Sequence, residues 1–278
     1  MDLLADPYDR APLRRDLDLL RNDAGVWPVL GGVPVVVPDP ARWLAARREH
    51  VLAALAEAGR ADPETVRRLD AFTHAVRGVG RVEVADDFVE DEEPTAVDWV
   101  PGEAEAALRA LLGGRSLSER LAADVTDGPV LEVGCGAGTL TRRIVPRPLV
   151  VVDLSLRAVL RATAGTDAVG VVGDAHALPV TRGAFGTVVA ANLLDLVDDP
   201  PGVVDELVAA LRPGGRLVCC TPDPALGIRG TDEALIDVLE DAGLRVTDDE
   251  DGIPWLRIHG PRHVQVYTVR RVVARRSA

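Results

Sequence analysis

The pattern of apolar and polar positions changes at about residue 129. From there onward, short apolar runs alternate with segments whose apolar residues recur at helical spacing, and this order predicts a mainly parallel sheet flanked by helices. We expect strands at 130–133, 149–152, 169–172, 187–191 and 216–221. Helices are expected at 138–145, 155–164, 202–211 and 231–242, and two terminal strands at 244–248 and 263–274.

The first 128 residues have a different pattern of apolar and polar positions. Residues 1–38 are rich in proline and predict irregular structure, with one edge-strand candidate at Val33–Val37. Asp39-Pro40 and Asp62-Pro63 each place a capping carboxylate before a proline, which predicts two helix starts. We expect these two helices to end near Gly59 and Gly78, and shorter helices to follow at 101–112 and 116–123.

These textures divide the chain into an N-terminal region, residues 1–115, and a second region, residues 116–278. Residues 81–98 are strongly acidic. We interpret them as a solvated loop, with a linker or a mobile lid as the alternatives.

Composition narrows the classes of function. The net charge is −13, and because a nucleic-acid-binding protein needs a basic face, this acidity argues against a nucleic-acid partner. The three cysteines, Cys135, Cys219 and Cys220, form neither a disulfide framework nor a metal spacing, and we predict no metal. The N-terminus does not resemble a signal peptide, and no apolar run reaches bilayer length. We therefore expect a cytoplasmic protein without a membrane partner.

A glycine-rich loop follows the first strand of the second region. It reads Glu132-Val133-Gly134-Cys135-Gly136-Ala137-Gly138-Thr139, and we expect it to open a helix. Glycines allow a tight turn and a close approach of the backbone to a ligand, and a helix N-terminus adds unpaired amides. The glycines recur at every second residue, which differs from the G-x-G-x-x-G pattern of dinucleotide enzymes.

Further segments follow this loop in a fixed order. Asp153 ends the second strand, and Gly173-Asp174-Ala175-His176-Ala177-Leu178-Pro179 follows the third. Phe185-Gly186-Thr187-Val188-Val189 and Leu211-Arg212-Pro213-Gly214-Gly215-Arg216-Leu217 come next. Over residues 129–221 this series resembles the class I methyltransferases that depend on S-adenosylmethionine. The resemblance implies a Rossmann-like α/β fold with a mainly parallel seven-stranded sheet, and a mostly helical N-terminal region that acts as a lid or recognises the substrate.

The resemblance also implies roles for individual residues. Asp153 would accept hydrogen bonds from the ribose hydroxyls, an arrangement for which a carboxylate is well suited. Asp174 would accept from the adenine amino group, the Ala175 amide would donate to a ring nitrogen, and Leu154 would pack on the adenine face. The full set of expected cofactor-binding residues is Glu132, Gly134, Cys135, Gly136, Gly138, Asp153, Leu154, Gly173, Asp174, Ala175 and Asn192.

Two residues are candidates for catalysis. His176 has a reference pKa near neutrality and could act as a general base, although we favour a polar wall of the pocket. Asn192 ends the fourth strand, beside the expected place of the methyl group. Gly186 stands where the family usually has an aspartate, and we expect a local change there without loss of cofactor binding.

A second resemblance lies near the N-terminus. Gly25-Val26-Trp27-Pro28-Val29-Leu30-Gly31-Gly32-Val33-Pro34-Val35-Val36 is similar to the core of small zinc-ribbon domains of the tRNA-methyltransferase-activator type. Those domains carry two cysteine pairs, whereas this chain has Asp6, Asp9, Asn22 and Gly25 at roughly the ligand positions. Thiolates are central to a structural zinc site, so we predict a relic without zinc; coincidence is the alternative.

Three classes of function remain open. The first is methyl transfer from S-adenosylmethionine to a small-molecule or peptide acceptor in natural product biosynthesis, by direct displacement at the sulfonium methyl, which needs alignment of the reactants and no catalytic triad. The second is an RNA or protein methyltransferase. Against it stand the acidity of the chain and the sequence Asn192-Leu193-Leu194-Asp195, which lacks the family's [ND]PP[YF] motif. The third is a protein that binds the cofactor without transferring its methyl group. The oligomeric state stays open, and a homodimer is compatible with the sequence.

Overall fold

The structure of the chain is a computed structural model that describes residues 3–76, 115–226, 234–260 and 263–278. The expected helix at 101–112, the acidic segment 81–98 and the expected helix end at Gly78 lie outside the described residues.

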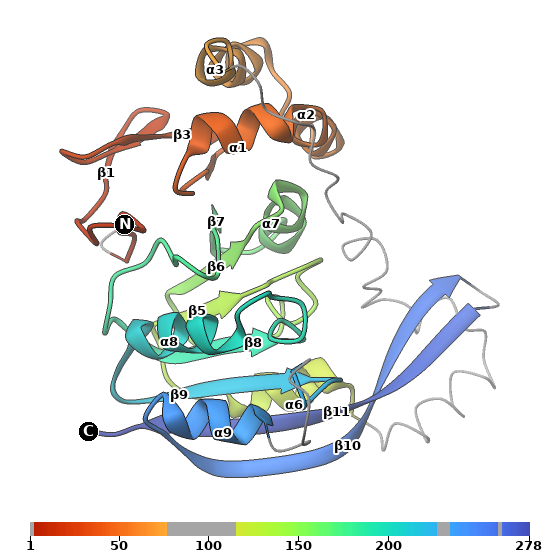
Figure 1. Cartoon of the computed structure of the whole chain (residues 1–278). Helices are drawn as coiled ribbons and strands as arrows, with labels where there is room; N and C mark the ends of the chain where they lie inside the picture. Colours follow the sequence, from red (N-terminus) through yellow and green to blue (C-terminus); the bar gives the residue numbers. More distant parts are fainter. Residues whose placement is uncertain (1–2, 77–114, 227–233, 261–262) are drawn as a thin grey trace.

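A seven-stranded mixed sheet forms the centre of the molecule (Figure 1). Its strands are β5 (Val130–Val133), β6 (Leu149–Asp153), β7 (Val169–Val172), β8 (Phe185–Ala191), β9 (Leu211–Thr221), β10 (Leu244–Gly260) and β11 (His263–Arg276). They lie in the order β10-β11-β9-β8-β5-β6-β7. Strands β5 to β9 pair in parallel, and β11 pairs antiparallel with both β9 and β10. This is the Rossmann-like α/β fold that the sequence predicts.

The order of the strands reverses at β5. The chain runs outward from β5 through β6 to β7 and then returns to the other side of β5 as β8. The loops that follow β5 and β8 therefore leave the sheet in opposite directions. Open α/β sheets bind ligands at such a switch point, outside the carboxyl ends of the strands.

Helices cover both faces of the sheet. Side chains of α8 (Pro200–Ala210) and α9 (Ala234–Asp241) pack in one buried cluster, against residues such as Leu131 and Val152. Side chains of α6 (Leu117–Asp124) and α7 (Leu156–Thr163) pack in a second cluster, against residues such as Val130 and Val151. None of the helices in the described ranges has the length and apolar character needed to cross a membrane.

The N-terminal region contains more strand than the sequence predicts. Instead of irregular structure, residues 14–34 form a small antiparallel sheet of β1 (Arg14–Asp16), β2 (Leu19–Arg21), β3 (Val26–Leu30) and β4 (Val33–Pro34). Most of these strands have only two or three residues, which is too short for an alternating pattern to stand out. Helices α1 (Pro40–Ala46), α2 (Arg48–Glu57) and α3 (Pro63–Thr73) follow.

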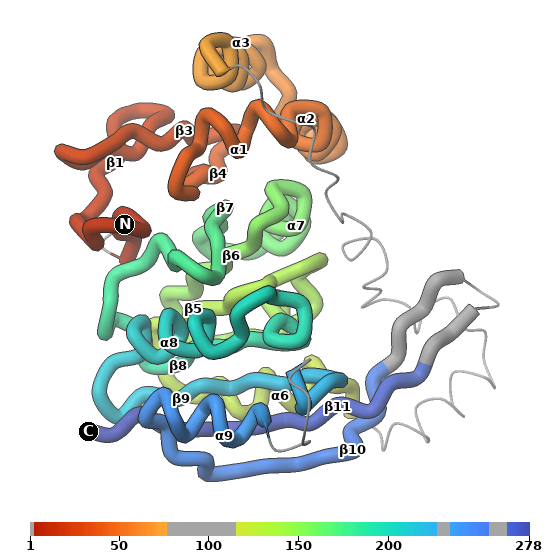
Figure 2. The backbone as a smooth tube through the Cα atoms, in the orientation of Figure 1, coloured from red at the N-terminus to blue at the C-terminus, as the bar shows by residue number. Residues whose placement is uncertain are grey.

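This N-terminal sheet lies against the β7 edge of the central sheet, as Figures 1 and 2 both show. Val35 forms a parallel bridge with Val172, and the Val36 amide donates to the Val172 carbonyl at 2.8 Å. Val36 is fully buried in the cluster of α8, whereas Val35 is buried in the cluster of α7. The N-terminal region therefore caps an otherwise open edge and joins both layers of the core.

Further contacts tie the first residues to the same region. Arg10 donates two hydrogen bonds to the Glu206 carboxylate, at 2.7 and 2.9 Å, and another to the Leu178 carbonyl at 2.7 Å. Arg10 and Glu206 are both largely buried, so this bidentate pair is more than a surface contact.

Hydrogen bonds connect Asp6, Asn22 and Gly25, three of the four residues at the positions where zinc-ribbon domains carry their ligands. The Asn22 side chain donates to Asp6 Oδ2 at 2.9 Å, and Asp6 is buried. Asp6 Oδ1 accepts from the Tyr8 amide, and Asn22 Oδ1 accepts from the amides of residues 24 and 25. These hydrogen bonds thus join the segment that begins at Asp6 to the turn at residues 22–25. That the protein contains no zinc stays a prediction.

Two expected helices differ from the structure. Residues 138–145 form a series of turns and no helix. The amides of Arg142 and Ile144 donate four residues back, but the Arg143 amide between them donates three residues back. Pro146 follows directly and disfavours helical geometry at Val145. The helix expected from Pro40 to Gly59 is broken at Arg47, whose φ of −115° and ψ of 15° separate α1 from α2.

We predict that Val36→Ala lowers the free energy of unfolding by about 2 kcal/mol, because it removes two buried methyl groups at the junction of both sheets. Val26→Ala, at a more exposed position of the same small sheet, is the matched control and should change stability little. Urea denaturation measures both, and a single shared transition is expected. A separate unfolding transition for the N-terminal region would contradict this account.

Candidate functional site

A cavity of about 800 Å³ opens at the carboxyl ends of β5, β6, β7 and β8. This volume is within the range of roughly 300–1,000 Å³ that small-molecule sites occupy. Its wall contains residues that follow each of these strands, together with Arg47 from the N-terminal region and an aromatic pair from β10 and β11.

The glycine loop forms the floor of this cavity through a close approach to its neighbours. The Gly134 amide donates to the Val152 carbonyl at 2.8 Å, which continues the β5–β6 pairing into the loop. Gly138 has a φ of +81°, and a Cβ atom there would lie 2.4 Å from the Cα of Ala162 in α7. Only glycine fits at position 138, so the loop is fixed against α7.

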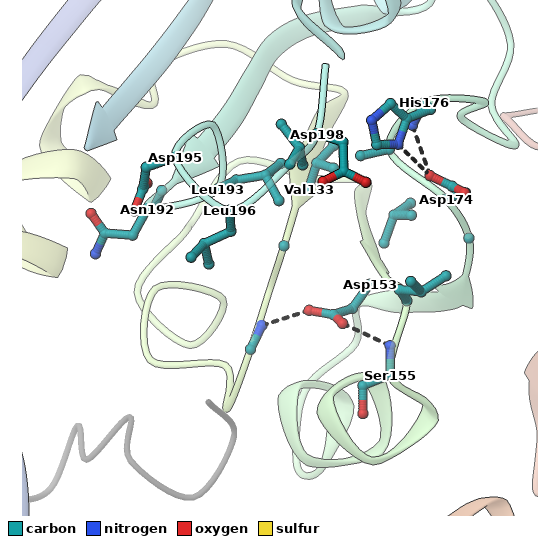
Figure 3. Close-up of a pocket in the computed structure, with 18 of the residues that line it drawn as sticks. Val133, Asp153, Ser155, Asp174, His176, Asn192, Leu193, Asp195, Leu196 and Asp198 are labelled. Carbon is teal, nitrogen blue, oxygen red and sulfur yellow. Dashed lines mark hydrogen bonds and ion pairs between the residues drawn. The ribbon is translucent and has the colours of Figure 1, made fainter. Parts of the chain in front are cut away.

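Asp153 holds the loop from the tip of β6. Its Oδ2 accepts a hydrogen bond from the Gly136 amide at 3.0 Å, and its Oδ1 accepts from the Ser155 amide at 2.8 Å (Figure 3). Ser155 caps α7 through its own hydroxyl, as its position in the sequence suggests. The Asp153 carboxylate therefore does not cap α7 itself and sits in the cavity wall.

Asp174 and His176 lie together on the same side of the cavity. The His176 amide donates to Asp174 Oδ1 at 2.9 Å, and His176 Nδ1 lies 2.9 Å from the same oxygen. In Figure 3 both side chains are well separated from those of Asn192 and Asp195. This geometry favours His176 as a positioning partner of Asp174, while a role as general base stays a prediction.

The loop after β8 forms the opposite wall. Asn192 has a φ of +49°, which is uncommon for a residue other than glycine, and its Oδ1 accepts from the Cys220 thiol at 3.3 Å. Asp195 Oδ1 accepts from the Thr221 hydroxyl at 2.9 Å. Burial raises the pKa of the Asp195 carboxyl, an effect that the Thr221 hydrogen bond partly offsets.

Trp255 and Tyr267 complete this wall from the C-terminal strands. They are directly opposite each other in the β10–β11 pair, and their ring centroids are 5.3 Å apart. Both rings line the cavity. Neither residue is in the set of site residues expected from the sequence, and the structure gives both a place at the cavity.

The structure gathers most of the expected site residues. The wall includes Gly134, Gly136, Asp153, Leu154, Gly173, Asp174, Ala175, His176 and Asn192. It does not include Glu132, Cys135 or Gly138, of which Glu132 and Cys135 are buried. Their expected contacts with a cofactor stay predictions. Among the described residues, no cluster of three His, Cys, Asp or Glu side chains could hold a metal ion.

Sequence reasoning does not anticipate several of the lining residues, among them Arg47, Leu193, Leu196 and Asp198. The last three belong to the loop whose first residue, Asn192, is expected at the site, so the run up to Pro200 could have been included. Arg47 lies more than 80 residues before the glycine loop, and nothing in its local pattern marks it.

Comparison of the sequence with known protein families gives a match to one family. The family model described as a methyltransferase domain matches residues 104–273. A malonyl-[acyl-carrier protein] O-methyltransferase of Hahella chejuensis is 35% identical over 130 residues, which are 42% of this chain and 47% of that protein. An uncharacterised methyltransferase of Mycobacterium bovis is 38% identical over 104 residues, which are 35% of this chain and 42% of that protein. The matches thus span less than half of these relatives' length.

A solved structure shares the fold. It is a chain from the complex between the Haloferax volcanii Trm112 methyltransferase activator and a methyltransferase. The TM-score is 0.53 at 17% identity, and the match covers 71% of this chain and 99% of that one.

We predict that Asp195→Asn raises the melting temperature at pH 7 by a few degrees. An acid whose pKa is raised by folding stabilises the fold only while it is protonated, and this contribution is lost as pH rises through its folded pKa. Asparagine carries no charge and keeps an oxygen for the Thr221 hydroxyl. Thermal unfolding measures the shift, with the exposed Asp205→Asn as control. A lower melting temperature for Asp195→Asn would contradict the inferred cost of this half-buried charge.

Proposed function

Since this chain belongs to the methyltransferase-domain family, which is class I and depends on S-adenosylmethionine, we propose that it transfers the sulfonium methyl group of this cofactor to a small-molecule or peptide acceptor in secondary metabolism. One observation carries the proposal. The glycine loop, Asp153 at the tip of β6 and Asp174 after β7 surround a single cavity of about 800 Å³.

The residues of this cavity fit the chemistry of the cofactor. Asp153 offers a carboxylate for the two ribose hydroxyls, and Asp174 offers an acceptor for an adenine amino group. Leu154 is apolar but 43% exposed, and its exposed side chain offers a surface on which the adenine ring can pack. We propose that these three residues bind the adenosine half, and that Gly134 and Gly136 face the methionine half.

Binding and alignment are the tasks we assign to the protein. When bound, S-adenosylmethionine supplies a methyl group activated by its positively charged sulfur. The chain's own residues hold the nucleophile in line with that methyl group and exclude water, which converts an encounter in solution into a reaction between fixed partners. We propose that the wall of Asn192, Asp195, Trp255 and Tyr267, opposite the adenosine residues, receives the acceptor.

Two observations favour a small-molecule or peptide acceptor. The relative from Hahella is named for O-methylation of a malonyl group on acyl-carrier protein, a small acceptor held by a protein. The net charge of −13 does not favour a nucleic acid. We further propose that residues 1–115 form the lid or substrate-recognition part, because Arg47 from this region is part of the cavity wall.

The proposal is tested by the affinity for S-adenosylhomocysteine, measured by calorimetry. We predict that Asp153→Ala weakens binding by an order of magnitude or more, because it removes charge-assisted hydrogen bonds worth about 1.5–3 kcal/mol each. It also removes the acceptor of the Gly136 amide, so the loop loses its anchor. Asp153→Asn should lose less affinity, and Asp205→Ala, an exposed change on α8, should lose none.

Two outcomes would overturn the proposal. Failure of the unchanged protein to bind S-adenosylhomocysteine would exclude the cofactor itself. Equal affinity of Asp153→Ala and the unchanged protein would exclude the ribose role of Asp153. Binding without methylation of any acceptor tried, in the presence of S-adenosylmethionine, would favour a cofactor-binding protein that transfers no methyl group.

A further inference from the structure

Arg47 lies where the first long helix of the N-terminal region breaks. It ends α1 and precedes α2, and its backbone conformation belongs to neither helix. Arg47 lines both the large cavity and a small hollow that shares Leu154 and Ser155 with it. It is the N-terminal region's contribution to the described wall of the cavity.

The guanidinium of Arg47 has unusually few partners. Within the described residues its side chain makes neither a hydrogen bond nor an ion pair, and its contact is with the Trp43 ring, 5.0 Å from the guanidinium carbon to the ring centroid. Neighbouring arginines differ. Arg48 pairs with Asp70 at 2.6 Å, and Arg161 pairs with Glu57 at 2.7 Å.

Holding the Arg47 guanidinium half-buried without hydrogen-bond partners costs free energy unless a bound molecule contacts the charge. Burial lowers the pKa of Arg47, and the negative charge of Asp174 raises it in part. A half-buried cation without hydrogen-bond partners loses solvation that nothing in the described structure returns. The guanidinium carbon lies over the Trp43 indole, and a planar guanidinium can stack on aromatic rings.

The residues around Arg47 show at which end of the cavity its side chain lies. Leu154 and Ser155 line the same hollow as Arg47, and the Asp174 charge acts on it electrostatically. These residues follow β6 and β7, at the end we assign to the adenosine half. The aromatic pair Trp255 and Tyr267 comes from β10 and β11, at the other end of the strand order from β6 and β7.

We propose that Arg47 is a cofactor-binding residue, whose guanidinium stacks on the adenine of S-adenosylmethionine and is held between that ring and Trp43. This inference rests on the proposed function, since it assumes the adenosine position given above. It makes the N-terminal region part of the cofactor site: the helix break at Arg47 places a cation beside the same ring that Leu154 covers.

The test measures the affinity of the full chain for S-adenosylhomocysteine and for 5′-methylthioadenosine, which lacks the amino-acid part. Arg47→Met keeps the length of the side chain and removes its charge and plane. Stacking of a cation on an aromatic ring predicts about 5- to 30-fold weaker binding of Arg47→Met. Because the contact is with adenine, both compounds should lose affinity by the same factor. Arg47→Lys should show an intermediate loss, because a lysine keeps the charge without the planar group.

Arg42→Met, at an exposed position of α1, is the matched control and should bind like the unchanged protein. The melting temperature without ligand separates binding from folding. Because Arg47→Met removes a half-buried charge, its melting temperature should not fall below that of Arg42→Met. This readout matters because a merely structural Arg47 would lower the melting temperature.

The possible results separate this inference from the proposed function. If the unchanged protein binds S-adenosylhomocysteine and Arg47→Met binds both compounds equally well, the adenine contact is wrong while the proposed function stands. A loss for S-adenosylhomocysteine but not for 5′-methylthioadenosine would also overturn it, since Arg47 would then act on the amino-acid part. If affinity for both compounds is unchanged and only the KM of an anionic acceptor rises, Arg47 binds the acceptor instead, and the inference fails.

Discussion

The close approach of the glycine loop to β6 and α7 is the constraint on which the rest of the site depends. At Gly138 the backbone passes so near Ala162 that no side chain fits, and at Gly136 the amide is held by the Asp153 carboxylate. This contact fixes the loop at the switch point of the sheet and leaves the cavity above it open. Because Asp153 both anchors the loop and faces the cavity, the architecture of the site and its chemistry use the same carboxylate.

The cavity has two chemically different ends. Asp153, Leu154 and Asp174 follow β6 and β7, and the N-terminal region adds Arg47 beside them. The loop after β8 and the paired strands β10 and β11 supply further lining residues, among them the half-buried Asp195 carboxyl with its raised pKa and two aromatic rings. A cofactor that occupies the first end would present its reactive group toward the second. The N-terminal region is fixed beside the first end, because Val35 and Val36 pack into the two core clusters next to β7.

Much of the central sheet could be predicted from the sequence, because buried parallel strands read as short apolar runs such as Leu149–Val152. The motif residues at the strand ends, Asp153 and Asp174, were likewise recognisable from their order. In the N-terminal region the edge strand expected at Val33–Val37 overlaps β4 and the Val35–Val172 bridge, whereas β1 and β2, with three residues each, are too short to show a strand pattern. The turns at 138–145 depend on Pro146 and on the loop contacts. The extent of β10 beyond residue 248 depends on its pairing with β11, through a stretch rich in aspartate that has no strand pattern. Arg47 reaches the site through a helix break that the amphipathic pattern does not reveal.

The most direct test of the central claim is a crystal structure of the chain with S-adenosylhomocysteine. The account predicts that the ribose hydroxyls lie within hydrogen-bond distance of Asp153, that the adenine lies beside Leu154 and Asp174, and that the sulfur points toward the wall of Asn192 and Asp195. The glycine loop should keep its bond to Asp153. Electron density for the ligand outside this cavity, or a ribose that makes no contact with Asp153, would contradict the account.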